Sequence, residues 1–456
     1  MKEKVIAIFD IGKTNKKILL FNYDLKLVYE TEEKPGQTND DDGFECDDID
    51  FIEKWIRKSI VELVHSEIYD LTAINFATYG ATLVYLDGQG RRLTPVYNYL
   101  KPIDERIPEE LYKRYGGKDE FCRRTASPAL GMLNSGLQAL WLKNVKPEIF
   151  CKVRNILHFP QYLSYLLTGK VYSEHTSLGC HTAMWDFDIM DYHQWVRDER
   201  LIVSQPVAVD TLNEIIVDGK KIEVGIGIHD SSASLAPYFA ADSNSFLLIS
   251  TGTWCINMNP FNTETLTSEQ LSKDCLCYMS INKQPVKSSR LFLGHMHDTA
   301  VEMMSGYFKI HENSFNLIKP DLRLLNKMRV KFENDKIFLN KSDQPRELKE
   351  DADLFAFDNF IEGYHQLMVE LSDLAIDSIN LIIPENNDDS QSIYITGGFS
   401  KNLLFLKMIA SSFPDKRVFT SEVSNATAIG AASVILSSLE KDKPAIPELG
   451  LIEVVI

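Results

Sequence analysis

Short apolar runs separated by turn residues open the chain, and this is the pattern of a β-meander. Apolar residues concentrate in the segments 5–9, 17–22 and 26–31, with glycine, asparagine or aspartate between them. We therefore expect three antiparallel strands at the start of the chain.

An amphipathic helix is expected after the meander. The acidic stretch 39–50 leads into 51–64, where apolar residues recur at helical spacing. Three aspartates can cap this helix, namely Asp47, Asp48 and Asp50. Segments 71–77 and 82–86 are apolar and predict strands. Hairpins, a helix and strands thus follow one another in an order that differs from a pure β-α-β alternation.

The same order of elements returns after residue 230. A second hairpin, a long helix, a strand and a final helix are expected over residues 245–250 with 254–258, 354–382, 393–396 and 425–439. These two similar halves indicate an α/β protein with an N-terminal lobe over residues 1–238 and a C-terminal lobe over residues 239–456. The polar segment 344–351 is expected to be a surface connection.

The composition is that of a globular protein with a large buried core. The chain has 456 residues, of which 44% are hydrophobic and 25% charged, and this length favours more than one domain. The formal net charge is −17, so the long-range field repels phosphate backbones and anionic lipids. We therefore expect neither nucleic acid nor a membrane as a partner.

The cysteines and the lack of long apolar runs favour a cytoplasmic location. The 7 cysteines are scattered, with one close pair at Cys275 and Cys277, and they form neither a zinc spacing nor a disulfide framework. The chain has no run of about 18 apolar residues, and the segment 5–9 is shorter than the core of a signal peptide. A homodimer is possible, because one sequence does not determine an oligomeric state.

The first candidate ligand site is the turn that follows Asp10. Gly12 lets the chain curl tightly, so that backbone N–H groups and the side chains of Thr14 and Asn15 face an anion, and Lys17 adds charge. Asp10 ends a buried strand and can hold Mg²⁺ through water. An ordinary hairpin turn uses the same residue types, so this turn alone does not establish phosphate binding.

Two further glycine turns occur later in the chain. Residues 250–254 form a hydroxyl-rich turn between strands, and residues 394–402 end a strand in paired glycines before a helix. Ser400 and Asn402 can cap that helix or bind a ligand. Turns without any ligand are the alternative. The order along the chain argues against it, because two strand-turn-strand units and one strand-Gly-Gly-helix unit resemble the phosphate and adenosine motifs of actin-like ATPases.

With these turns the chain resembles the FGGY family of carbohydrate kinases over nearly its whole length, which implies two actin-like (ribonuclease H-like) lobes with a cleft between them. The resemblance implies that ATP and Mg²⁺ bind at the three turns, through Asp10, Gly12, Lys13, Thr14, Asn15, Lys17, Thr251, Gly252, Thr253, Gly397, Gly398, Ser400 and Asn402. Segments 137–144 and 162–169 look like signatures of the family's N-terminal lobe. Gln138 stands where the signature has lysine and Lys13 where a small residue is usual, and either can alter phosphate contacts.

Asp230 matches the catalytic base of this family. A sugar hydroxyl is a poor nucleophile at neutral pH, so a carboxylate that accepts its proton is expected. Such a general base accelerates the reaction by a factor of about 10²–10⁴. Asp230 stands ahead of Ser231, Ser232 and Ala233, and a helix N-cap is the alternative role. Both roles are compatible, because an acceptor at a helix N-terminus stays ionised.

The segment 78–81 stands where the family reads its sugar. It lacks the Arg-Glu pair of glycerol kinases and the His-Gly pair of xylulose kinases. The chain is instead similar to the branch of the family that acts on the 6-deoxyketoses rhamnulose and fuculose. The positions that carry this similarity are Thr78, Tyr79, Gly80, His229, Asp230 and Trp254. An aromatic face such as Tyr79 suits the C–H surface of a sugar, and a core position is the alternative for this residue.

We therefore expect an ATP-dependent kinase of a small ketose, with ATP between the lobes and the sugar on the N-terminal lobe. A kinase of xylulose, ribulose or glycerol is the enzymatic alternative, and an actin-like ATPase without a sugar substrate is the remote one. Two other clusters do not indicate metals. The pair His295 and His297 lacks further ligands, and the triplet Asp40, Asp41 and Asp42 lacks calcium-loop spacing and is expected to be a solvated loop.

Overall fold

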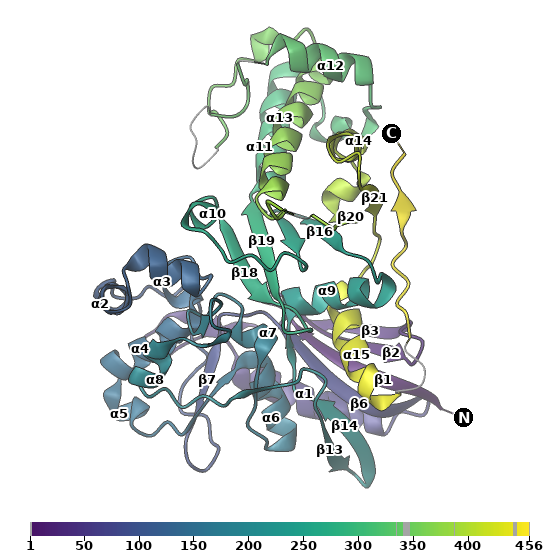
Figure 1. The fold of residues 1–456 in the computed structure, drawn as a ribbon. Coiled ribbons are helices and arrows are strands. Elements are labelled where there is room, and N and C mark those ends of the chain that lie inside the picture. Colours follow the sequence, from purple (N-terminus) through teal and green to yellow (C-terminus); the bar gives the residue numbers. More distant parts are fainter. Residues whose placement is uncertain (1, 334, 341–346, 387, 441–444, 456) are drawn as a thin grey trace.

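The computed structural model describes residues 2–333, 335–340, 347–386, 388–440 and 445–455. Two seven-stranded sheets form the centres of two lobes, which lie one above the other in Figure 1. Helices pack on the faces of both sheets, so the predicted α/β class with two lobes is confirmed.

The sheet of the N-terminal lobe contains the predicted meander. Its strand order is β13 (Leu212–Val217), β14 (Lys220–Gly225), β6 (Tyr69–Thr78), β1 (Glu3–Ile11), β2 (Lys16–Asn22) and β3 (Leu27–Glu33), with β15 (Ile228–His229) also paired to β6. β1 runs antiparallel to β2 and parallel to β6. The predicted segment 82–86 forms β7 (Leu83–Leu86), which pairs with β8 (Asn155–His158) outside this sheet.

Helices cover both faces of this sheet, namely α1 (Ile49–Val64), α6 (Phe159–Thr168), α9 (Asp230–Ala241) and α15 (Ala426–Leu439). Alternate residues of β1 point to opposite faces. Val5 and Phe9 share a core with α1 and α6, whereas Ile6 and Ile8 share a second core with α9 and α15. β1 is almost continuously apolar because both of its faces are buried. Of the three aspartates predicted to cap α1, Asp48 is the one that does so.

The sheet of the C-terminal lobe repeats the central arrangement of the first. Its order is β18 (Cys275–Met279), β19 (Pro285–Leu291), β17 (Cys255–Asn259), β16 (Phe246–Thr251), β20 (Ser392–Gly397), β21 (Arg417–Thr420) and β22 (Ile452–Glu453). β16 runs antiparallel to β17 and parallel to β20, as β1 does to β2 and β6. The predicted second hairpin and the strand 393–396 are thereby confirmed.

Four main helices accompany this sheet, namely α11 (Leu293–Phe308), α12 (Leu322–Lys331), α13 (Phe360–Asn380) and α14 (Leu403–Ser412). The helix predicted over 354–382 begins only at Phe360, because Asn359 caps it by accepting the backbone N–H of Glu362. The preceding residues form the separate short helix η3 (Leu354–Ala356). The predicted surface connection 344–351 lies partly outside the described residues.

The last helix, α15, returns to the N-terminal lobe and packs across α9 (Figure 1). Gly430 permits this close approach, since a Cβ at that position would lie 1.8 Å from the carbonyl oxygen of Ala233. The side-chain amide of Asn75 on β6 donates to the carbonyl of Ala431. The boundary placed after residue 238 falls within α9 and stays a prediction.

A helical insert that the sequence pattern did not predict follows β7 and forms the lower left part of Figure 1. Its elements are α2 (Arg106–Arg114), α3 (Lys118–Arg124), η1 (Gly131–Leu133), α4 (Ser135–Val145), α5 (Pro147–Phe150), α7 (His175–Leu178) and α8 (Gln194–Asp198). Short strands and helices elsewhere are β4 (Gln37–Asn39), β5 (Glu45–Asp47), β9 (Ser173–Glu174), β10 (Trp185–Asp186), β11 (Asp191–Tyr192), β12 (Pro206–Val207), α10 (Ser268–Ser272), η2 (Glu312–Leu317) and η4 (Gly398–Lys401).

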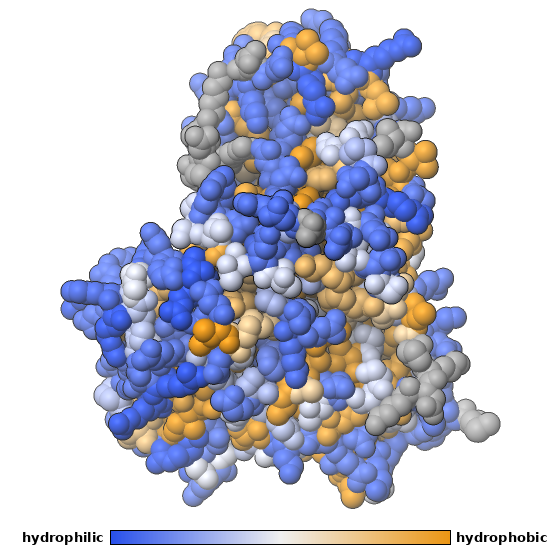
Figure 2. Space-filling model, viewed as in Figure 1, coloured by the Kyte–Doolittle hydropathy of each residue, from blue (hydrophilic) through white to orange (hydrophobic). Residues whose placement is uncertain are grey.

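Hydrophilic residues dominate the face shown in Figure 2, and apolar residues appear there in scattered groups. Exposed apolar side chains of the C-terminal lobe include Leu317 and Phe355. None of the helices in the described part of the chain combines the length and apolar character that crossing a membrane requires.

Candidate active site

Three parallel strands end together at one edge of the N-terminal sheet. Ile11 on β1 and His229 on β15 both lie beside Thr78, the last residue of β6. Asp10 precedes the first of these ends and Asp230 follows the second. Two carboxylates that are far apart in the sequence therefore reach the same edge.

Asp230 is the first residue of α9 and keeps contact with solvent, with 35% of its side chain exposed. Its Oδ1 accepts the backbone N–H of Ser231 at 2.6 Å. Burial raises the pKa of Asp230 to about 6, against the lowering effect of the Ser231 hydrogen bonds. Nε2 of His229 lies 3.2 Å from Oδ1, and burial lowers the pKa of His229 to about 4, so this histidine is neutral at pH 7. A carboxylate with a pKa near neutrality is well suited to accept a proton.

Asp10 is a second carboxylate with a raised pKa. Burial and the charge of Asp230 raise the pKa of Asp10 to about 6, while Lys17 lowers it. Hard carboxylate oxygens are the ligands that Mg²⁺ prefers, and a divalent cation favours the ionised form of a carboxylate. The residues at this edge therefore fit a magnesium ion, although its binding by Asp10 stays a prediction.

Asp47 holds the first glycine turn in place. Its carboxylate accepts Nζ of Lys13 at 2.6 Å, Nζ of Lys16 at 2.9 Å and the hydroxyl of Tyr79 at 2.7 Å. Lys16 is buried and also donates to the carbonyl oxygens of Gly12 and Lys13. Burial alone would raise the pKa of Asp47, but Lys13 and Lys16 outweigh it and hold the pKa below its usual range. The sequence pattern predicted only a helix cap at Asp47 and no role for Lys16.

The other predicted residues of this turn differ in their availability to a ligand. Lys17 lies on β2 and pairs with Glu30 at 2.7 Å. Thr14 is exposed at the turn, and Oδ1 of Asn15 is buried without a hydrogen-bond partner in the described part of the chain. The exposed Thr14 hydroxyl can thus donate to a phosphate directly, whereas Oδ1 of Asn15 is an acceptor that needs a donor, and both predicted lysines already bind carboxylates.

The second and third glycine turns pack directly against each other. The hydroxyl of Thr251 donates to the carbonyl of Thr396 and accepts the N–H of Phe399 at 3.0 Å. Gly397 has a φ of +86°, and a Cβ there would lie 1.6 Å from the carbonyl oxygen of Thr251. Only glycine fits at this position. The two turns therefore form one unit at the edge of the C-terminal sheet.

A pocket of about 380 Å³ opens beside this unit. Four of the predicted nucleotide residues line it, namely Gly252, Thr253, Gly398 and Asn402. Residues that the sequence analysis did not assign to a site complete it, and these are Gly294, His297, Asp298, Phe315, Asn316, Ile318, Tyr364, Phe399, Lys401, Leu403 and Leu404. Apolar and aromatic walls together with backbone amides at glycine turns fit a nucleobase and its phosphates.

The remaining predicted nucleotide residues act within the turns. Thr251 and Gly397 join the second turn to the third, and the Ser400 hydroxyl donates to the carbonyl of Gly397 at 2.7 Å. Asn402 has two roles, because it caps α14 and also donates its side-chain amide to the hydroxyl of Tyr364 at 2.8 Å. These contacts shape the pocket that the neighbouring glycines line.

Three of the predicted sugar residues are buried, and His229, at 4% exposed, is one of them. Thr78 is fully buried, and Tyr79 is 8% exposed, with its ring 5.4 Å from that of Phe159. Tyr79 thus occupies the core position that was its alternative, and a sugar contact by its ring stays a prediction. Gly80 allows His229 to approach, since a Cβ on Gly80 would lie 2.9 Å from Nε2 of that histidine.

Trp254 follows the second turn and carries an exposed aromatic ring. Its side chain is 45% exposed, and the Arg290 guanidinium lies over the ring at 5.5 Å from the centroid. Burial is the main cause of the raised pKa of Cys180, and there Asp230 raises the pKa further while Arg290 lowers it. Both lobes therefore place charges around Cys180, a residue for which the sequence analysis assigned no role.

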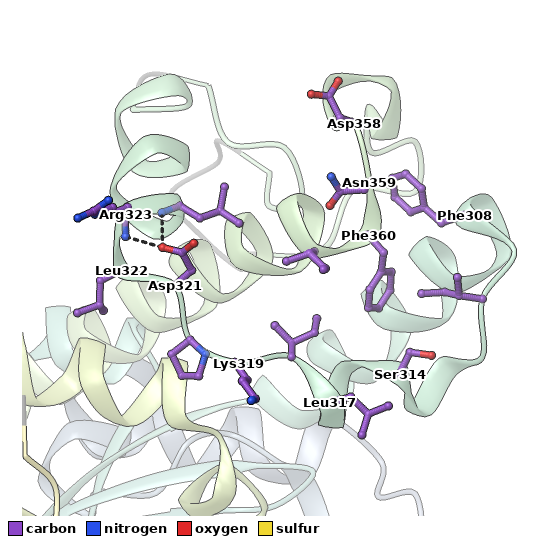
Figure 3. A pocket seen from close by; sticks show the side chains of 15 residues that line it. Phe308, Ser314, Leu317, Lys319, Asp321, Leu322, Arg323, Asp358, Asn359 and Phe360 are labelled. Atoms are coloured by element: carbon purple, nitrogen blue, oxygen red, sulfur yellow. Dashed lines mark hydrogen bonds between the residues drawn. The ribbon is translucent and has the colours of Figure 1, made fainter.

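A larger groove of about 950 Å³ lies in the outer part of the C-terminal lobe (Figure 3). Phe308, Leu317 and Phe360 form much of its apolar wall. Asp321 turns back onto the start of α12 in this view and accepts the backbone N–H of Arg323. None of the predicted site residues lines this groove, so its size does not mark the catalytic centre.

The triplet of aspartates forms ion pairs. Asp40 is buried and pairs with Lys101 at 2.6 Å, and Lys146 pairs with Asp41 at 2.7 Å and with Asp42 at 2.8 Å. The prediction of a solvated loop is therefore wrong for Asp40, whose charge is offset by a lysine distant in the sequence. The two lysines compensate much of the charge that a metal ion would need.

A family model described as the N-terminal domain of the FGGY family of carbohydrate kinases matches residues 5–233. Together with the two-lobed fold, this match defines the protein as an ATP-dependent phosphotransferase that acts on carbohydrates. The chain belongs to the FGGY family of carbohydrate kinases.

Solved structures share the whole fold. A carbohydrate kinase from Novosphingobium aromaticivorans is 22% identical with a TM-score of 0.82, over 100% of this chain and 94% of that one. A xylulose kinase from Lactobacillus acidophilus is 16% identical with a TM-score of 0.72, over 96% and 89% of the two chains. A glycerol kinase from Plasmodium falciparum is 15% identical with a TM-score of 0.70, over 95% and 89%. The predicted pair of actin-like lobes is thereby confirmed.

Proposed function

We propose that this protein transfers the γ-phosphoryl group of ATP to a hydroxyl of a small ketose, with Asp230 as the general base. The sugar oxygen forms a bond to the γ-phosphorus, the bond from that phosphorus to the bridging oxygen breaks, and the hydroxyl proton passes to Asp230 as ADP leaves. One observation carries the proposal: a partly exposed Asp230 with a pKa of about 6 stands at the edge where three strands end.

ATP would occupy the pocket beside the second and third turns, with its phosphates toward the first turn. Thr14 is exposed and has a hydroxyl that can donate to those phosphates, and a phosphate contact by Asn15 stays a prediction. Asp10 would hold Mg²⁺, which neutralises phosphate charge when bound. Arg290, which lies over the ring of Trp254, and Asp230 both affect the pKa of Cys180, and this is consistent with the placement.

A 6-deoxyketose such as L-rhamnulose or L-fuculose is the sugar that we favour. The neutral side chain of His229 beside Asp230 is only 4% exposed, so a sugar contact by it stays a prediction, whereas Trp254 offers an exposed aromatic face. Such a face suits the C–H surface and terminal methyl group of a deoxysugar. Xylulose, ribulose and glycerol are the alternative substrates. A xylulose kinase and a glycerol kinase are among the solved structures that share the fold.

A coupled assay of ADP release across a panel of these sugars tests the proposal. Asp230→Asn should lower the sugar-dependent rate about 10²-fold or more while ATP still binds. Asp104→Asn is the matched control, because Asp104 pairs with Arg106 on the surface of the insert. ATP turnover without any sugar dependence would instead indicate the actin-like ATPase, and an undiminished rate in Asp230→Asn would remove Asp230 from the mechanism.

A further inference from the structure

The short strand that carries the catalytic edge has strand pairing on one side only. β15 pairs with β6 through Ile228 and His229, and α9 then begins without a side-chain cap from His229. A buried backbone N–H at such a position needs a partner, because leaving it unsatisfied costs about 1–3 kcal/mol. The N–H of His229 finds this partner in the hydroxyl oxygen of Thr176, at 3.1 Å.

The hydroxyl of Thr176 is oriented by a buried carboxylate. It donates to Oε2 of Glu174 at 2.6 Å, so its lone pairs are left to accept the N–H of His229. Glu174 is held in turn by the backbone N–H groups of Thr176 at 2.6 Å and Ser177 at 3.2 Å. Its own backbone pairs with Val207 of β12.

The side chains in this chain of contacts are shielded from water. The exposed fractions of Glu174, Thr176 and His229 are 1%, 0% and 4%. Charge-assisted hydrogen bonds are stronger than neutral ones, and burial strengthens them further. The contacts therefore hold the backbone of His229 from the side opposite β6, one residue before Asp230.

We propose that Glu174 and Thr176 are positioning residues, which fix the backbone at His229 and thereby set the place of the Asp230 carboxylate relative to the acceptor hydroxyl. This inference rests on the proposed role of Asp230 as the base. It assigns a function to a four-residue helix, α7 (His175–Leu178), whose N-terminus Glu174 caps.

The test compares Thr176→Val, which removes the hydroxyl at nearly constant shape, with Thr176→Ser, which keeps the hydroxyl. Thr176→Val should lower kcat about 10- to 100-fold with both KM values within about twofold, because a shift of the base of roughly 1 Å affects the chemical step more than binding. Thr176→Ser should retain kcat within about threefold. Assays use ATP with the best sugar of the panel at pH 8, above the pKa of about 7 to which burial raises Glu174.

Two controls separate positioning from general stability. Thr125→Val removes another buried hydroxyl, which donates to the carbonyl of Phe121 at 2.8 Å within the helical insert, and it should leave kcat unchanged. In the Asp230→Asn background, Thr176→Val should change the residual rate less than about twofold, because its effect passes through the lost carboxylate.

A Thr176→Val enzyme with wild-type kcat, or one that lowers the residual rate of Asp230→Asn as strongly as it lowers the wild-type rate, would overturn the inference. Should Thr176→Val fail to fold, Glu174→Gln is judged by the same criteria. This change keeps the shape of the side chain but places an amide N–H₂ group against one of the donors that Glu174 binds, the N–H or hydroxyl of Thr176 or the N–H of Ser177. Full activity of Asp230→Asn would overturn the proposed function itself, so the two failures are distinguishable.

Discussion

The two lobes place the same hairpin beside the same kind of parallel strand, yet the two turns use different chemistry. In the N-terminal lobe the β1–β2 turn carries lysines, and Asp47 binds two of them, Lys13 and Lys16. In the C-terminal lobe the β16–β17 turn carries no charge, and the Thr251 hydroxyl ties it to the Gly397 turn by donating to the carbonyl of Thr396 and accepting the N–H of Phe399. Equal topology therefore does not mean equal function.

The difference separates two tasks. The edge of the N-terminal sheet collects ionisable groups whose pKa values are shifted, among them Asp10 and Asp230, and this suits proton transfer and metal binding. The edge of the C-terminal sheet brings backbones into close contact and leaves a pocket with aromatic walls. This arrangement suits a flat nucleobase, which needs space and backbone donors more than charge.

The largest expected effect comes from Asp47→Asn, which breaks the charged anchor of the first turn. Lys16 would stay buried without its ionised partner, and breaking such a pair costs about 3–5 kcal/mol. Glu30→Gln is the matched change at the exposed pair Lys17–Glu30 and should cost at most about 1 kcal/mol. Urea unfolding of both variants measures the two free energies. Equal losses would contradict the anchoring role of Asp47.

An intermediate effect is expected from Gly397→Ala, which separates the second turn from the third. The added Cβ meets the carbonyl of Thr251, and strain at such a backbone position is worth about 1–3 kcal/mol. Calorimetry should show an ATP affinity lower by about 10- to 100-fold. Gly306→Ala in α11 is the control, because nothing lies within 4 Å of its Cβ. Unchanged ATP affinity in Gly397→Ala would show that the two turns do not act as one unit.

The smallest effect is a pH dependence confined to the N-terminal edge. Burial raises the pKa of Asp230 to about 6, so kcat/KM should rise about tenfold per pH unit up to about pH 6 and then level off. ATP affinity at the C-terminal turns, which lack carboxylates with a pKa raised to about 6, should change less over this range.

The same raised pKa sets the sign of the effect on stability. A folded-state pKa above the ordinary value of 3.8 for an aspartate means that the contribution of this carboxyl to stability is present below about pH 4 and lost as the pH rises through about 6. Asp230→Asn should therefore melt at a higher temperature than the wild type at pH 7 and at a similar temperature near pH 4. A lower melting temperature at pH 7 would contradict the burial of this carboxyl.

Much of the fold could be predicted from local patterns, but the helical insert could not. The meander, the second hairpin and the final helix follow from apolar spacing and turn residues, which act over a few positions. Helix α4 shows why part of the insert escaped, because its residues from Ser135 to Leu142 are all buried, and even Gln138 lies inside. A helix that is buried all round has no polar face and hence no helical period in its sequence.

The sequence by itself determined the strands, the three glycine turns and their order, since glycine turns and apolar alternation depend only on neighbouring residues. Only the tertiary structure decided which polar side chains serve these turns. Asp47 reached the first turn instead of capping a helix, Tyr79 entered the core, and Thr176 met the backbone of His229. These contacts join segments distant in the chain, and their geometry arises from packing that no local pattern encodes.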